Sequence, residues 1–240
     1  MRKTIYLLAL LVLLFACKGE KQKNSSTQTL DTVEQENEIV GEATVASGVN
    51  IKDIFLLLPN DAFPMDEISK ANRKLLLSYI GKEKAFDISP TPIDICDEKN
   101  GFLSLTGTQY GWEMCYWNLK DGRKLVAING GTESGSEIRI FYYQNGKLTE
   151  DYNYRLGGNQ DYTFSDFVEV SQLSPDTREF AERQFAKGAF NLYYQLPQNG
   201  TSLTLSIDTD ELMDYDEIHE IPYEATKGLT LKWKNEKWER

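Results

Sequence analysis

The sequence predicts an α+β protein built mainly on an antiparallel β-sheet, with N-terminal helices packed on one side. Residues 50–81 carry apolar residues at helical spacing. From Gly101 onward apolar and polar residues alternate in short segments, which is typical of strands, and Asp-Gly or Asn-Gly pairs separate several of them. Helix signals at the front followed by strand signals favour this class. A β-sandwich or an open barrel is the alternative arrangement of the same strands.

Two helices open the predicted domain. Asn50 can cap the first, and Pro59 ends it. The second begins at Pro64 and stops at Gly81. The apolar stripes are Ile51, Ile54, Phe55 and Leu58 in the first helix, and Ile68, Ala71, Leu75, Leu76 and Tyr79 in the second. Each helix therefore has one face to bury against the sheet.

About nine strands follow in hairpin order. Asp121-Gly122 and Asn145-Gly146 are strong hairpin signals because these residues tolerate positive φ. The expected strands are residues 102–106, 112–119, 124–129, 138–143, 148–154, 164–170, 190–196, 203–208 and 229–233. A helix capped by Ser174, with Pro175 at its first position, interrupts them and ends at Gly188.

The first seventeen residues have the organisation of an export signal. Arg2 and Lys3 precede an apolar run from Ile5 to Phe15, which is shorter than the roughly 20 residues of a membrane-spanning helix. The order Leu14-Phe15-Ala16-Cys17 resembles the lipobox of bacterial lipoproteins, which are cleaved before the cysteine and acylated on it. An uncleaved helical anchor and an ordinary secretory signal are the other readings.

The resemblance to lipoproteins implies a location and a domain organisation. Residues 1–16 are then a signal peptide, and Cys17 carries a diacylglyceryl group and usually a third chain such as palmitate. Two or more chains anchor a protein stably to a membrane. The resemblance implies the cell envelope, most simply the outer membrane, with a periplasmic or a surface-facing orientation both open. The whole chain loosely resembles small uncharacterised envelope lipoproteins of Bacteroidota-type bacteria.

Composition divides the rest of the chain. Residues 17–48 contain no aromatic residue and are rich in Lys, Glu, Gln, Ser and Thr, which predicts a lipidated, disordered tether. Residues 49–240 are of a suitable size for a single β-rich globular domain. The formal net charge of the chain is −11. Such acidity disfavours nucleic acid as a partner and leaves the lipid as the link to the membrane.

Cysteine usage leaves two readings. Beyond Cys17 the chain has Cys96 and Cys115. The compartment outside the inner membrane is oxidising, so these two residues could form a disulfide. Two separate thiols are the alternative, since Cys115 stands among aromatic residues and suits a small core position.

Familiar catalytic signatures are missing from the sequence. His219 is the single histidine, no Gly-x-Ser-x-Gly or Cys-x-x-Cys motif is present, and no phosphate-binding glycine pattern occurs. The acidic residues between Asp208 and Glu217 do not match a calcium loop. We therefore expect no cofactor, no metal site and no catalytic residue that the sequence can name.

Aromatic pairs on the strands are the remaining functional signal. The pairs are Tyr142-Tyr143 and Tyr193-Tyr194, and each places one ring on either face of its strand. The rings on one face of the sheet belong to the core. The rings on the other face either pack against the sheet or form an exposed surface that binds a sugar or a peptide. The leading hypothesis is a lipid-anchored, non-enzymatic binding or accessory domain with an unidentified protein or glycan partner. A carboxylate-based hydrolase of envelope glycans or peptides and a structural subunit of an envelope assembly are the alternatives.

Overall fold

The computed structural model describes residues 48–63, 67–82, 91–106, 111–158, 161–213 and 219–240. The predicted signal peptide, Cys17 and nearly all of the predicted tether lie outside the described residues. The described part belongs to one compact unit.

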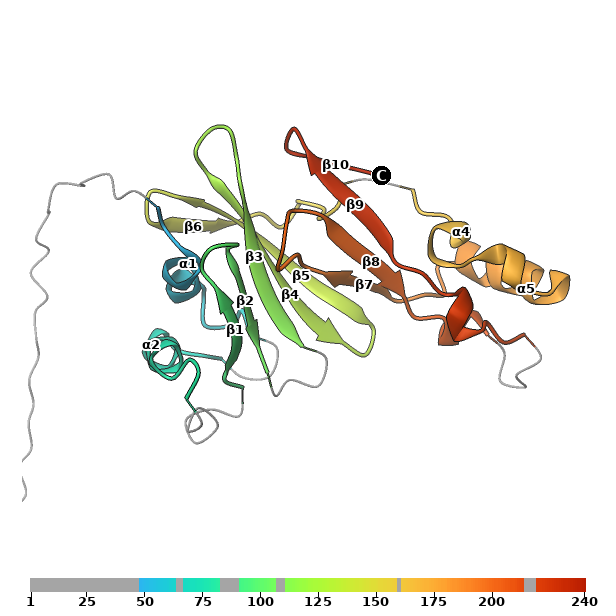
Figure 1. Ribbon diagram of the computed structural model, residues 1–240, viewed down its shortest axis with the longest axis horizontal. Helices are drawn as coiled ribbons and strands as arrows, with labels where there is room; N and C mark the ends of the chain where they lie inside the picture. The colour runs from blue at the N-terminus through green and yellow to red at the C-terminus, as the bar shows by residue number, and fades with distance from the viewer. Residues whose placement is uncertain (1–47, 64–66, 83–90, 107–110, 159–160, 214–218) are drawn as a thin grey trace, which may run out of the picture. The chain divides into compact units, whose positions relative to one another are not determined.

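Two antiparallel sheets form the framework and confirm the predicted α+β class (Figure 1). The first sheet follows the chain in the order β1-β2-β3-β4-β5-β6, and the second has the order β10-β9-β8-β7. The strands of the first sheet are β1 (Ile93–Asp97), β2 (Phe102–Leu105), β3 (Trp112–Asn118), β4 (Lys124–Thr132), β5 (Gly135–Gln144) and β6 (Lys147–Glu150). The second sheet comprises β7 (Leu192–Gln195), β8 (Leu203–Ile207), β9 (Leu229–Lys234) and β10 (Lys237–Glu239). Neither sheet closes into a barrel within the described ranges.

Both faces of the first sheet are covered. The cross-strand row Phe102, Cys115, Ala127 and Ile140 packs into the cluster that contains the second sheet. Neighbouring residues point to the opposite face, where Leu103 and Met114 pack with the N-terminal helices. The first sheet is therefore a middle layer between the helices α1 (Ile51–Leu57) and α2 (Lys70–Ser78) and the second sheet.

The first helix follows the prediction and the second departs from it. Asn50 caps α1 in a reciprocal capping box with Asp53, and Leu58 is the C-cap. The second helix begins at Lys70 rather than at Pro64, because the Ser69 hydroxyl accepts a hydrogen bond from the Asn72 amide and caps it there. Residues 64–66 lie outside the described ranges.

Strand predictions fail in three places. β1 was not expected, although Ile93 and Ile95 alternate with aspartate and a cysteine. Residues 164–167, expected as strand, form the short helix α4 (Phe164–Phe167), because Thr163 and Asp166 form a capping box at its start. β6 ends at Glu150, so residues 151–154 are not strand. By contrast, the helix α5 (Pro175–Ala186) begins after Ser174 as predicted.

The free edge of β7 is satisfied by side chains of the first sheet. The Tyr194 amide donates to Ser136 Oγ at 2.8 Å, and the Tyr194 carbonyl accepts from Asn129 Nδ2 at 2.6 Å. The next outward-facing amide, that of Leu196, donates to Glu113 Oε1 at 2.7 Å. These bonds join the two sheets and give the edge strand the partners that an exposed edge lacks.

Candidate functional site

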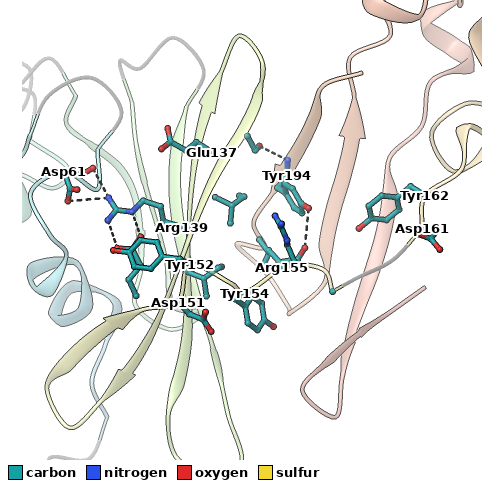
Figure 2. Close-up of a pocket in the computed structure, with 16 residues that line it drawn as sticks. Asp61, Glu137, Arg139, Asp151, Tyr152, Tyr154, Arg155, Asp161, Tyr162 and Tyr194 are labelled. Atoms are coloured by element: carbon teal, nitrogen blue, oxygen red, sulfur yellow. Dashed lines mark hydrogen bonds and ion pairs between the residues drawn. The ribbon is translucent and has the colours of Figure 1, made fainter. Parts of the chain in front are cut away.

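A cleft of about 900 Å³ opens beside β5 and β6. It forms because the chain leaves the sheet at the end of β6 and turns at Asp151, whose amide still donates to the Ile140 carbonyl at 2.9 Å. The following residues, 152–158, run along the opening toward Asp161, and Tyr194 of β7 adds to the lining. Figure 2 shows the polar side chains on both sides of this opening.

One wall of the cleft is fixed by Arg139. Its Nε and Nη2 atoms donate to the two carboxylate oxygens of Glu150, each at 2.8 Å, across the β5–β6 pair. Its Nη1 atom donates to the Asp61 carbonyl at 2.9 Å and lies 3.4 Å from the Asp61 carboxylate. The Arg139 guanidinium lowers the pKa of Glu150, and Glu150 in turn raises the pKa of Arg139. A bidentate pair of this kind holds both groups in one geometry.

Hydrogen bonds from two side chains fix the loop that carries Asp61. Arg73 of α2 is buried and donates to the Leu58 carbonyl at 2.6 Å and also to the Ile68 carbonyl. Trp112 of β3 donates from its indole nitrogen to the Ala62 carbonyl at 2.9 Å. These bonds fix the loop between α1 and α2 against the sheet, and with it the outer partner of Arg139.

Four tyrosines line the cleft. Tyr152 is 84% exposed, and its hydroxyl is hydrogen-bonded to the Glu150 carboxylate, which raises the pKa of Tyr152. The Tyr154 ring packs edge-on against Tyr142 with centroids 6.4 Å apart. Tyr194 donates to the Leu156 carbonyl at 3.3 Å, and burial raises its pKa to about 12. Tyr162, half-buried, is the fourth. Three rings are thus held in place, while Tyr152 presents its ring to solvent.

Charge in the cleft is mixed but predominantly negative. The charged lining residues are Asp61, Glu137, Glu150, Asp151 and Asp161 against Arg139 and Arg155, which leaves a formal charge of −3. Arg139 is engaged by Glu150 and Asp61, whereas Arg155 is exposed. Carboxylates therefore provide most of the polar groups that a ligand would meet.

Neither of the two tyrosine pairs singled out in the sequence contributes a fully exposed ring. All four are half-buried, because the first sheet is covered on both sides and β7 lies against it. Arg123 lies over the Tyr142 ring at 4.5 Å, and the Tyr143 hydroxyl accepts from the Gly146 amide. Tyr193 donates to the Glu133 carbonyl at 3.3 Å. Tyr194 alone of the four lines the cleft.

Sequence reasoning did not find the cleft itself. Tyr152 and Tyr154 stood in a segment expected to be strand, where alternation would have placed them on one sheet face. The signal that could have corrected this is the run Asp151-Tyr152-Asn153, since the Asp151 carboxylate accepts from the Asn153 amide and turns the chain. The Arg139–Glu150 pair becomes visible once the β5–β6 register is known.

Both remaining cysteines are free and separate. In the β1-β2-β3 register Cys96 pairs with Leu103, and Cys115 pairs with Phe102, the neighbour of Leu103. They therefore point to opposite faces of the sheet, and Cys115 packs in the cluster with the second sheet while Cys96 packs with the helices. Burial raises the pKa of both thiols. This placement does not support a disulfide between them.

His219 does not stand alone in solvent: it is half-buried and stacks on Phe180 with ring centroids 4.7 Å apart. No group of three or more histidine, cysteine or acidic side chains within the described residues is arranged to hold a metal ion. Part of the acidic run, residues 214–218, falls outside those residues. In the described part of the chain, no helix is long and apolar enough to cross a membrane.

Comparison with known proteins yields one informative similarity. No protein family matches the sequence, and no curated protein matches it. Among solved structures, the chain is similar to a domain of an uncharacterized protein from Porphyromonas gingivalis W83, with a TM-score of 0.51 and 14% sequence identity. The match covers 79% of this chain and 96% of that one. At this identity the similarity shows a shared fold.

Proposed function

We propose that this chain is a lipid-anchored protein of the bacterial cell envelope whose folded domain binds a ligand in the tyrosine-lined cleft, without transforming it. The observation that carries the proposal is the Tyr152 ring, 84% exposed beside polar groups that the fold holds rigidly. An exposed ring next to preorganised hydrogen-bonding groups can stack on a ligand and orient it with little loss of entropy. The ligand class is a peptide or a glycan.

The lipid anchor rests on the sequence around Cys17. The Leu14-Phe15-Ala16-Cys17 order follows a short apolar run and a basic start, as a lipoprotein signal requires. The similar fold in a protein of Porphyromonas gingivalis, a member of the Bacteroidota, is consistent with this origin. We infer that the anchor places the domain at the outer membrane.

Membrane fractionation tests the anchor. Wild type should sediment with membranes and be released by detergent, because two or more acyl chains hold a protein stably in the bilayer. A Cys17→Ser variant should move to the soluble fraction. Equal membrane retention of the two forms would refute lipid anchoring through Cys17.

Binding in the cleft is tested with a matched pair of tyrosines. Tyr223 is 86% exposed, almost the same as Tyr152, but lies on a 3-10 turn away from the cleft. We expect short peptides or oligosaccharides from a defined panel to bind wild type and Tyr223→Ala equally, and to bind Tyr152→Ala more weakly. If no panel member distinguishes Tyr152→Ala from Tyr223→Ala, the cleft is not the binding site.

A hydrolase is the second candidate function, because the cleft is lined by five carboxylates. Glycoside hydrolysis needs one carboxyl group that is protonated at working pH. Arg139 lowers the pKa of Glu150, so Glu150 does not suit that role. Release of reducing ends or new amino groups from envelope material, lost in a Glu137→Gln variant, would favour the enzyme over the binding domain.

A structural subunit finds less support. Such a protein would expose a contiguous apolar patch. Among the described residues, the large hydrophobic side chains that are exposed are Leu75, Tyr152 and Tyr223, and they belong to three separate segments.

A further inference from the structure

We propose that the cleft recognises a positively charged group, such as an arginine or lysine side chain of a peptide. This inference rests on the proposed binding function and names the chemistry of its ligand. Three observations carry it: the sign of the charge in the cleft, the pairing of Arg139 with Glu150 and Asp61, and the uncovered ring of Tyr152.

The charge in the cleft favours a cation. The lining carries five carboxylates and two guanidiniums, and the whole chain has a net charge of −11. A field of one sign in a concave site raises the local concentration of ligands of opposite charge. Glu137 is exposed on β5 and forms no ion pair with the described residues, so its carboxylate is available to a ligand.

The arginines of the cleft do not reverse this preference. Arg139 already uses Nε, Nη1 and Nη2 on Glu150 and Asp61, and its charge is compensated there. Arg155 is exposed, and its single positive charge is opposed in the same lining by the carboxylates of Glu137, Asp151 and Asp161. An anionic ligand would therefore meet net repulsion from the remaining carboxylates.

Arginine and lysine side chains of this protein lie over several of its aromatic rings, but none of those among the described residues lies over the ring of Tyr152. Arg123 lies 4.5 Å from the Tyr142 ring centre, and Lys124 lies 4.1 Å from that of Tyr116. No arginine or lysine among the described residues lies over the Tyr152 ring, although Tyr152 is bonded to the Glu150 carboxylate and lines the cleft together with four further carboxylates. A carboxylate beside an open tyrosine face is the combination that binds ammonium and guanidinium groups.

The test compares a cationic peptide with a neutral isostere. N-acetyl-tri-arginine amide and N-acetyl-tri-citrulline amide, each carrying the same fluorophore, are titrated with the full chain in detergent, and binding is followed by anisotropy. The arginine peptide should bind more tightly, and its affinity should fall as salt is raised from about 0.01 to 0.15 M, because salt screens exposed charges. The citrulline peptide should bind weakly at every salt concentration.

Five variants locate the interaction. Tyr152→Ala and Glu137→Gln should each weaken binding of the arginine peptide about two- to five-fold, whereas Tyr152→Phe keeps the ring and should bind normally. The matched controls, Tyr223→Ala and Glu224→Gln, alter an equally exposed ring and an exposed carboxylate away from the cleft. They should bind as wild type.

The outcomes separate this inference from the function on which it rests. Equal affinity for the arginine and citrulline peptides would overturn cation recognition. So would equal losses in the cleft variants and the controls, which indicate nonspecific attraction to an acidic surface. Binding of maltotriose or of a tri-glutamate peptide that depends on Tyr152 would also overturn it, but would leave the binding function standing. If neither the cationic peptide nor these alternatives bind in a Tyr152-dependent way, both proposals fail.

Discussion

Buried and half-buried polar side chains connect the layers of this protein. Glu113 of β3 accepts hydrogen bonds from the Leu196 amide at 2.7 Å and from Asn129 Nδ2 at 2.9 Å. Asn129 in turn donates to the Tyr194 carbonyl. Removing one member leaves a covered donor without a partner, which costs about 1–3 kcal/mol. We therefore expect Glu113→Ala to reduce the free energy of unfolding by that amount, as measured by urea denaturation.

The same residue predicts a pH dependence of stability. Burial raises the pKa of Glu113 in the folded protein, so the folded state holds this proton more tightly than the unfolded chain does. The contribution of Glu113 to stability is then complete below the unfolded pKa of about 4.3 and declines as pH rises through the folded pKa. Glu113→Gln keeps the acceptor and removes the titration.

Urea denaturation of wild type and Glu113→Gln between pH 4 and pH 7 measures this effect. The difference in unfolding free energy should shift in favour of Glu113→Gln as pH rises. A difference that stays constant over the range would contradict a raised pKa at Glu113.

At the scale of elements, local capping decided where sequence patterns succeeded and failed. Ser174 with Pro175 predicted α5 correctly because both act locally. The strand expected at residues 164–170 was wrong because the Thr163–Asp166 capping box overrides the aromatic alternation. The second helix was placed too early because Pro64 gave a start signal, whereas the actual cap is Ser69. The pattern of apolar and polar residues does not locate these helix starts. It shows which side chains are apolar, but not which backbone amides receive a capping hydrogen bond.

The loop between α1 and α2 depends on a residue that no apolar pattern could select. Arg73 is 2% exposed and donates to loop carbonyls, while Leu75, expected in the buried stripe, is 41% exposed. Arg73→Leu should lower the free energy of unfolding by about 2–4 kcal/mol, because it removes several buried hydrogen bonds. The exposed neighbour Lys74 provides the control, and Lys74→Leu should change stability by less than about 0.5 kcal/mol. Equal effects of the two substitutions in urea denaturation would contradict the role of Arg73.

The two-sided packing of the first sheet also predicts the redox state of the domain. Cys96 and Cys115 face opposite sides, so a Cys17→Ser chain should show two free thiols when denatured without reductant and with air excluded. Cys115 is 2% exposed, so its thiol should react slowly with a thiol reagent before denaturation. A count of zero thiols would contradict the placement of the two cysteines.

At the scale of the whole molecule, the arrangement of layers explains why the fold class could be predicted and the site could not. Hairpin signals are local in the sequence and predict antiparallel strand pairs. The apolar faces of these strands and of the helices must then be buried against one another, which gives a layered α+β fold. Which rings stay exposed depends on which layer covers each face. Tyr142 and Tyr194 were attractive candidates by sequence, but both pack against the cluster between the sheets. Tyr152 became exposed because the chain leaves the sheet one residue after Glu150.

In our proposal, the protein binds its ligand in the cleft beside β5 and β6. The most direct measurement is a titration of the isotope-labelled Cys17→Ser chain with the tri-arginine peptide, followed by backbone amide chemical shifts. We predict saturable shifts concentrated in residues 136–140, 150–156 and 161–162, with residues 223–225 unchanged. Shifts centred on residues 223–225, or spread evenly over the acidic surface, would contradict a binding site in the cleft.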